Sequence, residues 1–469
     1  MGFQRGRLNG LLHRHRALGE PVAPEDFNQA VEAAGANPAT DLLASAGAIQ
    51  TPAESQSRDD FLGDAHLPLT PREVENLRRL IAMNHASLTH AEALRDKQAQ
   101  AVWGVHFVSP VFNTLMRELN GQRNVARLLR AAALEAHQRG DDAEAVERVR
   151  QLLLQARALY RHPGFIVAHL VTVGVNDLAA DVARELAPDL EIGPPHDGRQ
   201  PASPEQIRRI IGLLLDEQPI RDGQRLELLS ERMFEVDTAE ATVSGRIDVM
   251  TASGSNVRGN PLLGYVLGPL IYKDARLMFE RQSKLVAIAQ SPDWQTCNRQ
   301  FNAFPQKTSY GMQHFFLRIL TPALDRALLQ DFRALTESRL TAVMLALRWY
   351  AVEHDGKVPA DLSELVPSYS PSVPADPMTP AAPLRYKPDP KDPIIYSTGD
   401  DGIDDGGSTT PINPRRSQSN DWDRKDFVVH LNRQPREFEP DEPEQPAAES
   451  PATEPASTQP ADSPATEPS

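Results

Sequence analysis

The residues best suited to chemistry in this 469-residue chain lie in one short run, residues 397–407, where aspartates alternate with glycines. Four carboxylates fall within six residues of that run: Asp400, Asp401, Asp404 and Asp405. Carboxylates this close repel one another unless water or a cation neutralises them. The glycines let the backbone turn tightly and direct carbonyl oxygens inward, which an oxygen-only calcium site requires. The run therefore indicates either a calcium site or a solvated turn.

Sequence motifs for several other chemistries are missing. The chain contains no GxGxxG, GxxxxGK[ST], HExxH or GxSxG pattern, the usual signatures for dinucleotides, phosphates, zinc hydrolysis and a nucleophilic serine. Its single cysteine, Cys297, excludes an internal disulfide and a multi-cysteine zinc site, and we interpret it as a small packed residue. His13 and His15 have no third ligand nearby and are expected on a solvated basic helix.

Composition excludes further classes of function. The chain has 49 Lys and Arg against 64 Asp and Glu, a net charge of −15, which argues against a nucleic-acid partner. No apolar run reaches the roughly 18 residues that a membrane span needs. The arginine-rich start, residues 1–20, lacks the apolar core of a signal peptide. The sequence thus predicts a mostly folded, acidic protein without a membrane span in the residues given.

The elements that must position the aspartates begin with a helical body. Thr70, Pro71 and Glu73 predict a helix start with a capping box, and the apolar positions that follow predict one long helix through Ala91. Gly140, followed by two aspartates that could cap the next helix, separates two more helical patterns and predicts a helical hairpin.

Further periodic segments extend this helical body. Helices are expected near 110–138, 142–161, 163–187, 203–215, 222–235, 269–289 and 320–354. Residues 236–262 are rich in Gly, Ser, Thr and Asn and predict a loop or a short hairpin, whereas residues 291–318 show no clear periodicity.

After Gly356 repeated prolines exclude long helices, and three short β-prone pieces follow, residues 384–386, 394–397 and 427–429. They predict a small antiparallel sheet packed on the helix that ends near His354. The fold class is therefore α+β: a predominantly α-helical body, a small C-terminal antiparallel β-sheet and a disordered tail.

Four regions are expected along the chain. They are a basic N-terminal helix with a poorly ordered connection (1–68), an α-helical domain (69–337), a helix with the small sheet and the Asp/Gly loop (338–435), and a disordered Pro/Glu-rich tail (436–469). The tail carries nine acids and one base and repeats Ser-Pro-Ala-Thr-Glu-Pro, so it cannot bury enough apolar surface to fold.

Residues 340–431 resemble the C-terminal half of the major pseudopilin of type II secretion systems. The shared features, in order, are Gly-Lys-Val-Pro at 356–359, Pro-Ala-Asp-Pro at 374–377, Tyr-Ser-Thr-Gly-Asp-Asp-Gly at 396–402, Gly-Gly at 406–407 and a late aspartate, Asp426.

The resemblance implies that the late loop binds calcium through aspartates and backbone carbonyls. By position Asp401 matches the loop aspartate and Asp426 the late one, while Asp404 and Asp405 are additional or substitute acids. The expected calcium ligands are these four aspartates, with carbonyls from residues 397–402.

The whole chain also resembles a group of membrane-anchored bacterial proteins, chiefly at residues 19–22, 127–145 and 340–407. This resemblance implies an extracytoplasmic or inner-membrane-associated location and predicts an anchoring helix before the given start. The chain lacks a prepilin peptidase site, so we do not expect it to polymerise as a pilin does.

The expected function is that of a non-enzymatic cell-envelope or secretion-associated protein with a helical body that binds a protein partner. A hydrolase using paired loop carboxylates and a helical adaptor without metal are the alternatives.

Overall fold

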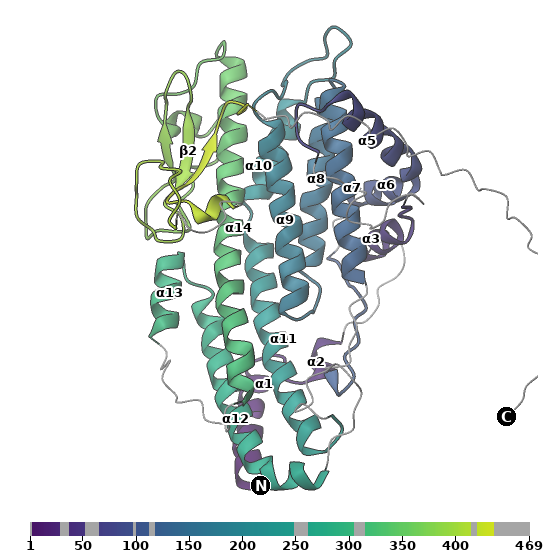
Figure 1. Cartoon of the computed structure of the whole chain (residues 1–469), viewed down its shortest axis with the longest axis vertical. Helices are drawn as coiled ribbons and strands as arrows, with labels where there is room; N and C mark the ends of the chain where they lie inside the picture. The colour runs from purple at the N-terminus through teal and green to yellow at the C-terminus, as the bar shows by residue number, and fades with distance from the viewer. Residues whose placement is uncertain are drawn as a thin grey trace, which may run out of the picture. The chain divides into compact units, whose positions relative to one another are not determined.

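Helices make up most of the described chain, and a small sheet follows them (Figure 1). The computed structural model describes residues 2–28, 37–51, 65–96, 100–111, 118–247, 261–303, 315–413 and 420–435. The predicted α+β class, a helical body followed by a small antiparallel sheet, is confirmed. The predicted disordered tail lies outside the described residues.

The α-helices, in chain order, are α1 (Gly2–Ala17), α2 (Pro24–Phe27), α3 (Pro38–Gly47), α5 (Pro71–Met83), α6 (His85–Glu92), α7 (Glu118–Gln138), α8 (Asp142–Leu159), α9 (Ile166–Leu186), α10 (Pro204–Leu215), α11 (Gln218–Val243), α12 (Pro261–Ile288), α13 (Trp294–Asn302) and α14 (Phe315–Glu353). The strands are β1 (Arg385–Lys387), β2 (Ile394–Ser397) and β3 (Phe427–His430). Helix α8 packs between α7 and α9, and α14 packs against α9 and α10.

Local capping signals place several helix starts where the sequence predicts them. The hydroxyl of Thr70 accepts a hydrogen bond from the Glu73 amide at 3.2 Å, and the Thr70 amide donates to the Glu73 carboxylate at 2.7 Å. Asp141 accepts from the Glu144 amide at 3.0 Å and caps α8. Gly140 precedes it with a φ of +84°, a conformation that favours glycine. The predicted hairpin of α7 and α8 is confirmed.

The prediction of a single long helix from Thr70 to Ala91 is wrong, because the structure has two helices, α5 and α6, that are separated at Asn84. The buried amide of Asn84 donates to the carbonyls of Leu80 at 3.0 Å and Gln50 at 3.2 Å. It also accepts from the Gln50 amide at 2.8 Å. A partner more than thirty residues away thus holds the residue at which α5 ends and α6 begins.

The loop expected over 236–262 is wrong at both ends, because α11 continues to Val243 and α12 begins at Pro261. Residues 248–260 lie outside the described residues. Asp237 accepts a hydrogen bond from the Val111 amide at 2.7 Å. Thr242 donates to the Thr238 carbonyl at 2.7 Å. These polar side chains therefore have partners within or against the helix, and the polar composition does not end it.

Residues 294–302 form α13, although no periodicity was expected over 291–318. Asp293 caps the helix by accepting from the Thr296 amide at 2.8 Å. Trp294, Cys297 and Phe301 are buried on one face, so Cys297 is the packed residue that the sequence predicts.

Helix α1 is the exposed basic helix that the sequence suggests on most of its surface, but one apolar side of it is packed. Leu8 and Leu11 are buried in a small cluster with Tyr272 and Phe279 of α12. These aromatic residues cover one apolar face of α1, and the exposed Arg5 lies over the Tyr272 ring at 5.9 Å.

Part of the connection expected to be poorly ordered is also a helix. Asn37 caps α3 by accepting from the Ala39 amide at 3.1 Å, and Leu42 of that helix is fully buried. Residues 29–36 and 52–64 of this region lie outside the described residues.

Helix α9 is long and apolar enough to cross a membrane by length and composition alone. Within the protein 61% of its most apolar window is buried against other helices. This burial is typical of a core helix, and α9 packs between α8 and α14.

The three strands form an antiparallel sheet in the order β1-β2-β3. Ile395 of β2 pairs with Tyr386 of β1 and Val429 of β3. The sheet packs on α14, as the sequence predicts. Helix α14 runs without a break through residue 338, where a region boundary was expected.

Candidate functional site

A buried carboxylate fixes the strand end from which the Asp/Gly loop departs. Asp376, 2% exposed, accepts hydrogen bonds from the Ser397 hydroxyl at 2.7 Å and the Thr398 amide at 3.0 Å. It also forms an ion pair with Arg385 at 3.1 Å. These hydrogen bonds thus attach the Pro-Ala-Asp-Pro turn to the end of β2. The motif Pro-Ala-Asp-Pro is visible in the sequence, but Asp376 is not among the functional residues predicted from it.

The first carboxylate of the Asp/Gly loop ties the loop to the helical body. Asp400 forms a bidentate ion pair with the guanidinium of Arg333 on α14, one nitrogen donating to each carboxylate oxygen. Its backbone carbonyl accepts from Gln295 Nε2 of α13 at 3.0 Å. Asp400 was noted in the acidic run but was not expected to be a ligand, and these contacts give it an anchoring role.

Two of the predicted calcium ligands pair with cations, one in β1 and one just before β3. Asp404 accepts from Arg385 Nε at 2.7 Å and from the Tyr396 hydroxyl at 3.2 Å. Burial alone raises the pKa of Asp404, but the Gly406 amide and the Arg385 guanidinium lower it below its usual value. Asp405 pairs with Lys425 Nζ at 2.7 Å. The repulsion anticipated from the sequence is therefore partly neutralised within the fold.

The late aspartate lies under the loop, as the order of the motif suggests. Asp426 is fully buried and accepts from the Ser408 amide at 2.8 Å and the Asp405 amide at 3.4 Å. Burial raises the pKa of Asp426, the backbone amides oppose the shift, and the charge of Asp404 adds to it. The structure thus brings Asp404, Asp405 and Asp426 together.

Asp401 differs from buried Asp426 in its exposure, although the charges of both act on Lys425. It is exposed, and its carboxylate accepts from the Ile403 amide at 2.8 Å. Across the described residues, no group of three or more His, Cys, Asp or Glu side chains is arranged to hold a metal ion. Calcium binding at this loop therefore stays a prediction.

A second set of titratable groups, absent from the sequence predictions, lies inside the helical body. His169 of α9 faces Asp331 of α14, and Gln224 of α11 donates to the same carboxylate at 2.8 Å. Each of the three side chains is buried. A lone histidine among apolar residues gives no sequence signal for such a cluster, because its partners come from other helices.

Three buried acids follow along α11 at four-residue spacing, which places them on one face. Glu231 accepts from the Ile166 amide at 2.8 Å, and Glu235 accepts from Gln282 at 3.0 Å. Burial raises the pKa values of Glu227 and Glu235 to about 8. Among the described residues, Oε1 of Glu227 and Oε2 of Glu235 have no hydrogen-bond partner. In sequence such a spacing looks like a solvated helix face.

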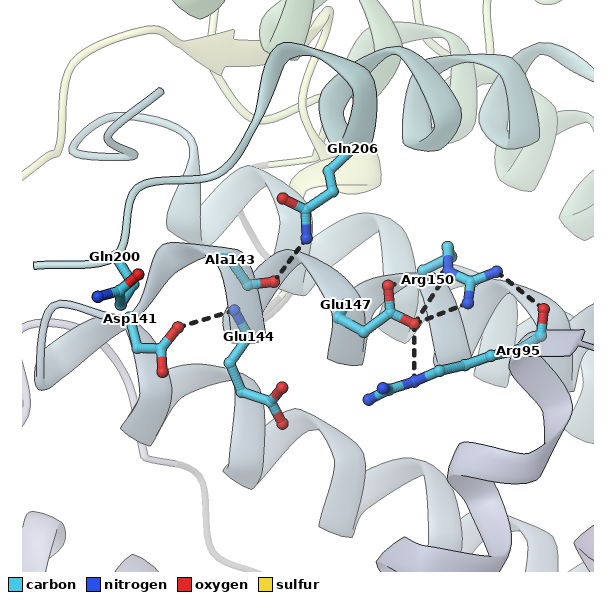
Figure 2. A pocket seen from close by; sticks show the side chains of 8 residues that line it. All are labelled: Arg95, Asp141, Ala143, Glu144, Glu147, Arg150, Gln200 and Gln206. Carbon is cyan, nitrogen blue, oxygen red and sulfur yellow. Dashed lines mark hydrogen bonds and ion pairs between the residues drawn. The ribbon is translucent and has the colours of Figure 1, made fainter. Parts of the chain in front are cut away.

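Figure 2 shows a surface pocket of about 480 Å³ beside the start of α8. Its charged side chains already contact one another: Glu147 pairs with Arg95 and Arg150 at 3.0 and 2.8 Å. Gln206 donates to the Ala143 carbonyl at 3.0 Å. The lining is thus an internally paired polar network, and it does not resemble a set of groups converging on an absent ligand.

Comparisons with family models, with curated proteins and with solved structures find no match to this chain. The resemblance of residues 340–431 to pseudopilins therefore stays a prediction. The function has to be inferred from the residues and contacts themselves.

Proposed function

We propose that this protein is a non-enzymatic, cell-envelope-associated binding protein whose C-terminal sheet is stabilised by calcium at the Asp/Gly loop. One observation supports the proposal. The backbone amide of Asp405 donates to the carboxylate of Asp426 at 3.4 Å beside Asp404, although the two residues are 21 positions apart in the chain. Calcium takes six to eight oxygens at about 2.3–2.6 Å, and carboxylates, carbonyls and water supply such a set.

Calcium would compete with two ion pairs that now neutralise the loop. The side chains of Asp404 and Lys425 are 45% and 41% exposed, so water screens the pairs they form. Exposed pairs of this kind contribute about 0–1 kcal/mol each. A divalent ion held by several carboxylates at once can replace such contacts, and Asp401 is exposed at the adjoining turn.

The loop is well placed to transmit a stabilising effect to the helical body. Arg333 holds Asp400, and Glu337 of the same helix accepts from Trp422 Nε1 at 2.8 Å. Calcium at the loop would therefore strengthen the attachment of the sheet to α14. The envelope location and the protein partner of the body rest on the family resemblance.

A hydrolase based on the same carboxylates is less well supported. Asp426 is fully buried and its oxygens already accept backbone amides, so no substrate can reach it without opening the loop. A general acid or base must be within hydrogen-bond reach of its substrate.

The test is calcium titration calorimetry and thermal unfolding of the full chain. At a hundredfold excess over Kd, calcium should add about 2.7 kcal/mol to the free energy of unfolding. The double variant Asp401→Asn and Asp405→Asn should lose most of this response. Asp389→Asn, an exposed aspartate in the β1–β2 turn, should keep it.

Magnesium should stabilise the protein less, because it demands a tighter octahedral shell and keeps its waters. An equal calcium response in the double variant would place the ion elsewhere. If calcium neither bound nor shifted the unfolding transition, the protein would be a helical adaptor with a solvated turn.

A further inference from the structure

An exposed apolar stripe runs along the first turns of α12. Leu262, Tyr265, Val266 and Leu270 are 71%, 67%, 65% and 45% exposed. Their spacing places them on one face of the helix, and the exposed Lys273 follows on the same face. Single exposed apolar residues are ordinary, whereas a contiguous row of them marks a contact surface.

The stripe lies at the tip of the hairpin formed by α11 and α12. The two helices approach so closely there that a Cβ atom on Gly264 would lie 2.4 Å from the Val243 carbonyl oxygen. This contact fixes the first turns of α12 against the last turn of α11. The stripe is therefore held by a packed backbone contact.

The start of α1 lies at the same end of the helical body (Figure 1). Arg5 approaches Glu240 of α11 at 3.9 Å and lies over the Tyr272 ring of α12 at 5.9 Å. Phe3, one turn or less before it, is 74% exposed, and Arg7 lies over the Phe3 ring. Two aromatic side chains and several arginines thus accompany the apolar stripe.

The charge of this tip is opposite to that of the whole chain. Residues 2–17, 241–247 and 261–273 contain no acidic residue, and Glu240, which approaches Arg5, is an acid that borders them, although the protein carries a net charge of −15. Arg5, Arg7, Arg246 and Lys273 supply positive charge there. A negatively charged surface would attract this end and repel much of the remaining chain.

We propose that this tip, defined by Phe3, Arg5, Arg7, Arg246 and residues 262–273, docks on an anionic lipid bilayer. The apolar stripe and Phe3 would enter the headgroup region, where amphipathic segments bury one face, while the cations would contact lipid phosphates. Tyr265 has the apolar ring and polar hydroxyl that suit a membrane interface. A second copy fits less well, because a symmetric contact would bring the two cationic tips together.

The test uses flotation of the full chain with vesicles of phosphatidylcholine alone or mixed with phosphatidylglycerol. We expect binding to the mixed vesicles only, weakened when salt rises from about 0.05 to about 0.5 M because salt screens lipid charge. Val266→Glu should weaken this partitioning about tenfold or more, since it places a carboxylate in the stripe. Arg5→Gln with Arg7→Gln should weaken it severalfold.

The matched control is Val167→Glu on α9, because Val167 is 64% exposed and Val266 is 65% exposed. This control should bind vesicles as the unmodified protein does, with both variants keeping its circular dichroism spectrum and unfolding midpoint. Equal binding by Val266→Glu and the control, or no binding by the unmodified protein, would overturn the proposal. A concentration-dependent dimer that Val266→Glu abolishes, without vesicle binding, would assign the stripe to a second copy instead. Calcium binding at the Asp/Gly loop is independent of these outcomes.

Discussion

Nε2 of His169 on α9 lies 2.6 Å from Oδ1 of Asp331 on α14, and both side chains are buried. Burial alone lowers the pKa of His169, but the carboxylate of Asp331 raises it to about 9. His169 therefore keeps its proton at neutral pH and forms an ion pair inside the helical body. Through Gln224 the same carboxylate also joins α11.

We expect the protein to lose stability as the pH rises from mildly acidic to alkaline values. The pKa of His169 is about 9 when folded, so its stabilising contribution is complete below the unfolded value of 6.5 and is lost as the pH passes 9. Glu227 and Glu235 have folded pKa values of about 8 against 4.5 when unfolded. The folded state thus binds more protons between these values, and stability falls across that range.

Urea unfolding at about pH 6 and about pH 9 measures this dependence. Glu227→Gln with Glu235→Gln should flatten it, whereas Glu205→Gln, whose side chain is 58% exposed, should leave it unchanged. A free energy of unfolding that rose between the two pH values would contradict the predicted protonation states.

Removing one partner of the buried ion pair should be strongly destabilising. Asp331→Ala leaves the charged His169 without its carboxylate, a change that typically lowers the free energy of unfolding by about 3–5 kcal/mol. Asp181→Ala on α9 is the control, because Asp181 is 52% exposed and pairs with Arg184 at only 3.5 Å. We expect the free energy of unfolding of the control variant to fall by less than about 1 kcal/mol. Similar losses in both variants would refute a special role for the pair.

Releasing Asp400 should loosen the sheet from the helical body. Asp400→Ala removes the ion pair with Arg333 and should increase hydrogen exchange of the loop amides and of β2. Asp421→Ala, which removes an exposed neighbouring pair with Arg424 at 3.3 Å, is the control. Unchanged exchange after Asp400→Ala would mean that other contacts hold the loop.

Gly264 should tolerate no side chain. In Gly264→Ala the new methyl group would meet the Val243 carbonyl, so α11 and α12 would have to separate and the unfolding midpoint should fall. At Gly174 of α9 nothing lies within 4 Å of a Cβ atom, and alanine there should stabilise the helix by up to about 1 kcal/mol. We expect the unfolding midpoint to fall in Gly264→Ala and to rise in Gly174→Ala, and thermal unfolding measures both changes.

The sequence predicts those parts of the fold that local chemistry decides. Thr70 and Asp141 cap their helices with neighbours three residues away, so their signals are complete within one turn. Asn84 breaks a helix because of its contact with Gln50, which no local pattern contains. The buried acids of α11 are missed for the same reason, since Ile166 and Gln282 come from other helices.

For the candidate site, the order of motifs in the sequence predicts that Asp426 lies near the Asp/Gly loop. It does not predict which side chains anchor that loop. The expected proximity of Asp426 to the Asp/Gly loop is found, because the antiparallel pairing of β2 and β3 brings both to one sheet end. The anchoring roles of Asp376 and Asp400 depend on Arg385 and Arg333, whose positions follow only from the fold.

The unbroken course of α14 limits how this chain could be recombined with a relative. Arg333 and Glu337 hold Asp400 and Trp422, yet both precede residue 338 on a helix of 39 residues. A crossover at 338 would give a chimera whose sheet faces a foreign half-helix without those two partners. A crossover before Phe315 would transfer the whole of α14 and the sheet together, so both contacts would be kept and no helix would be joined from two halves.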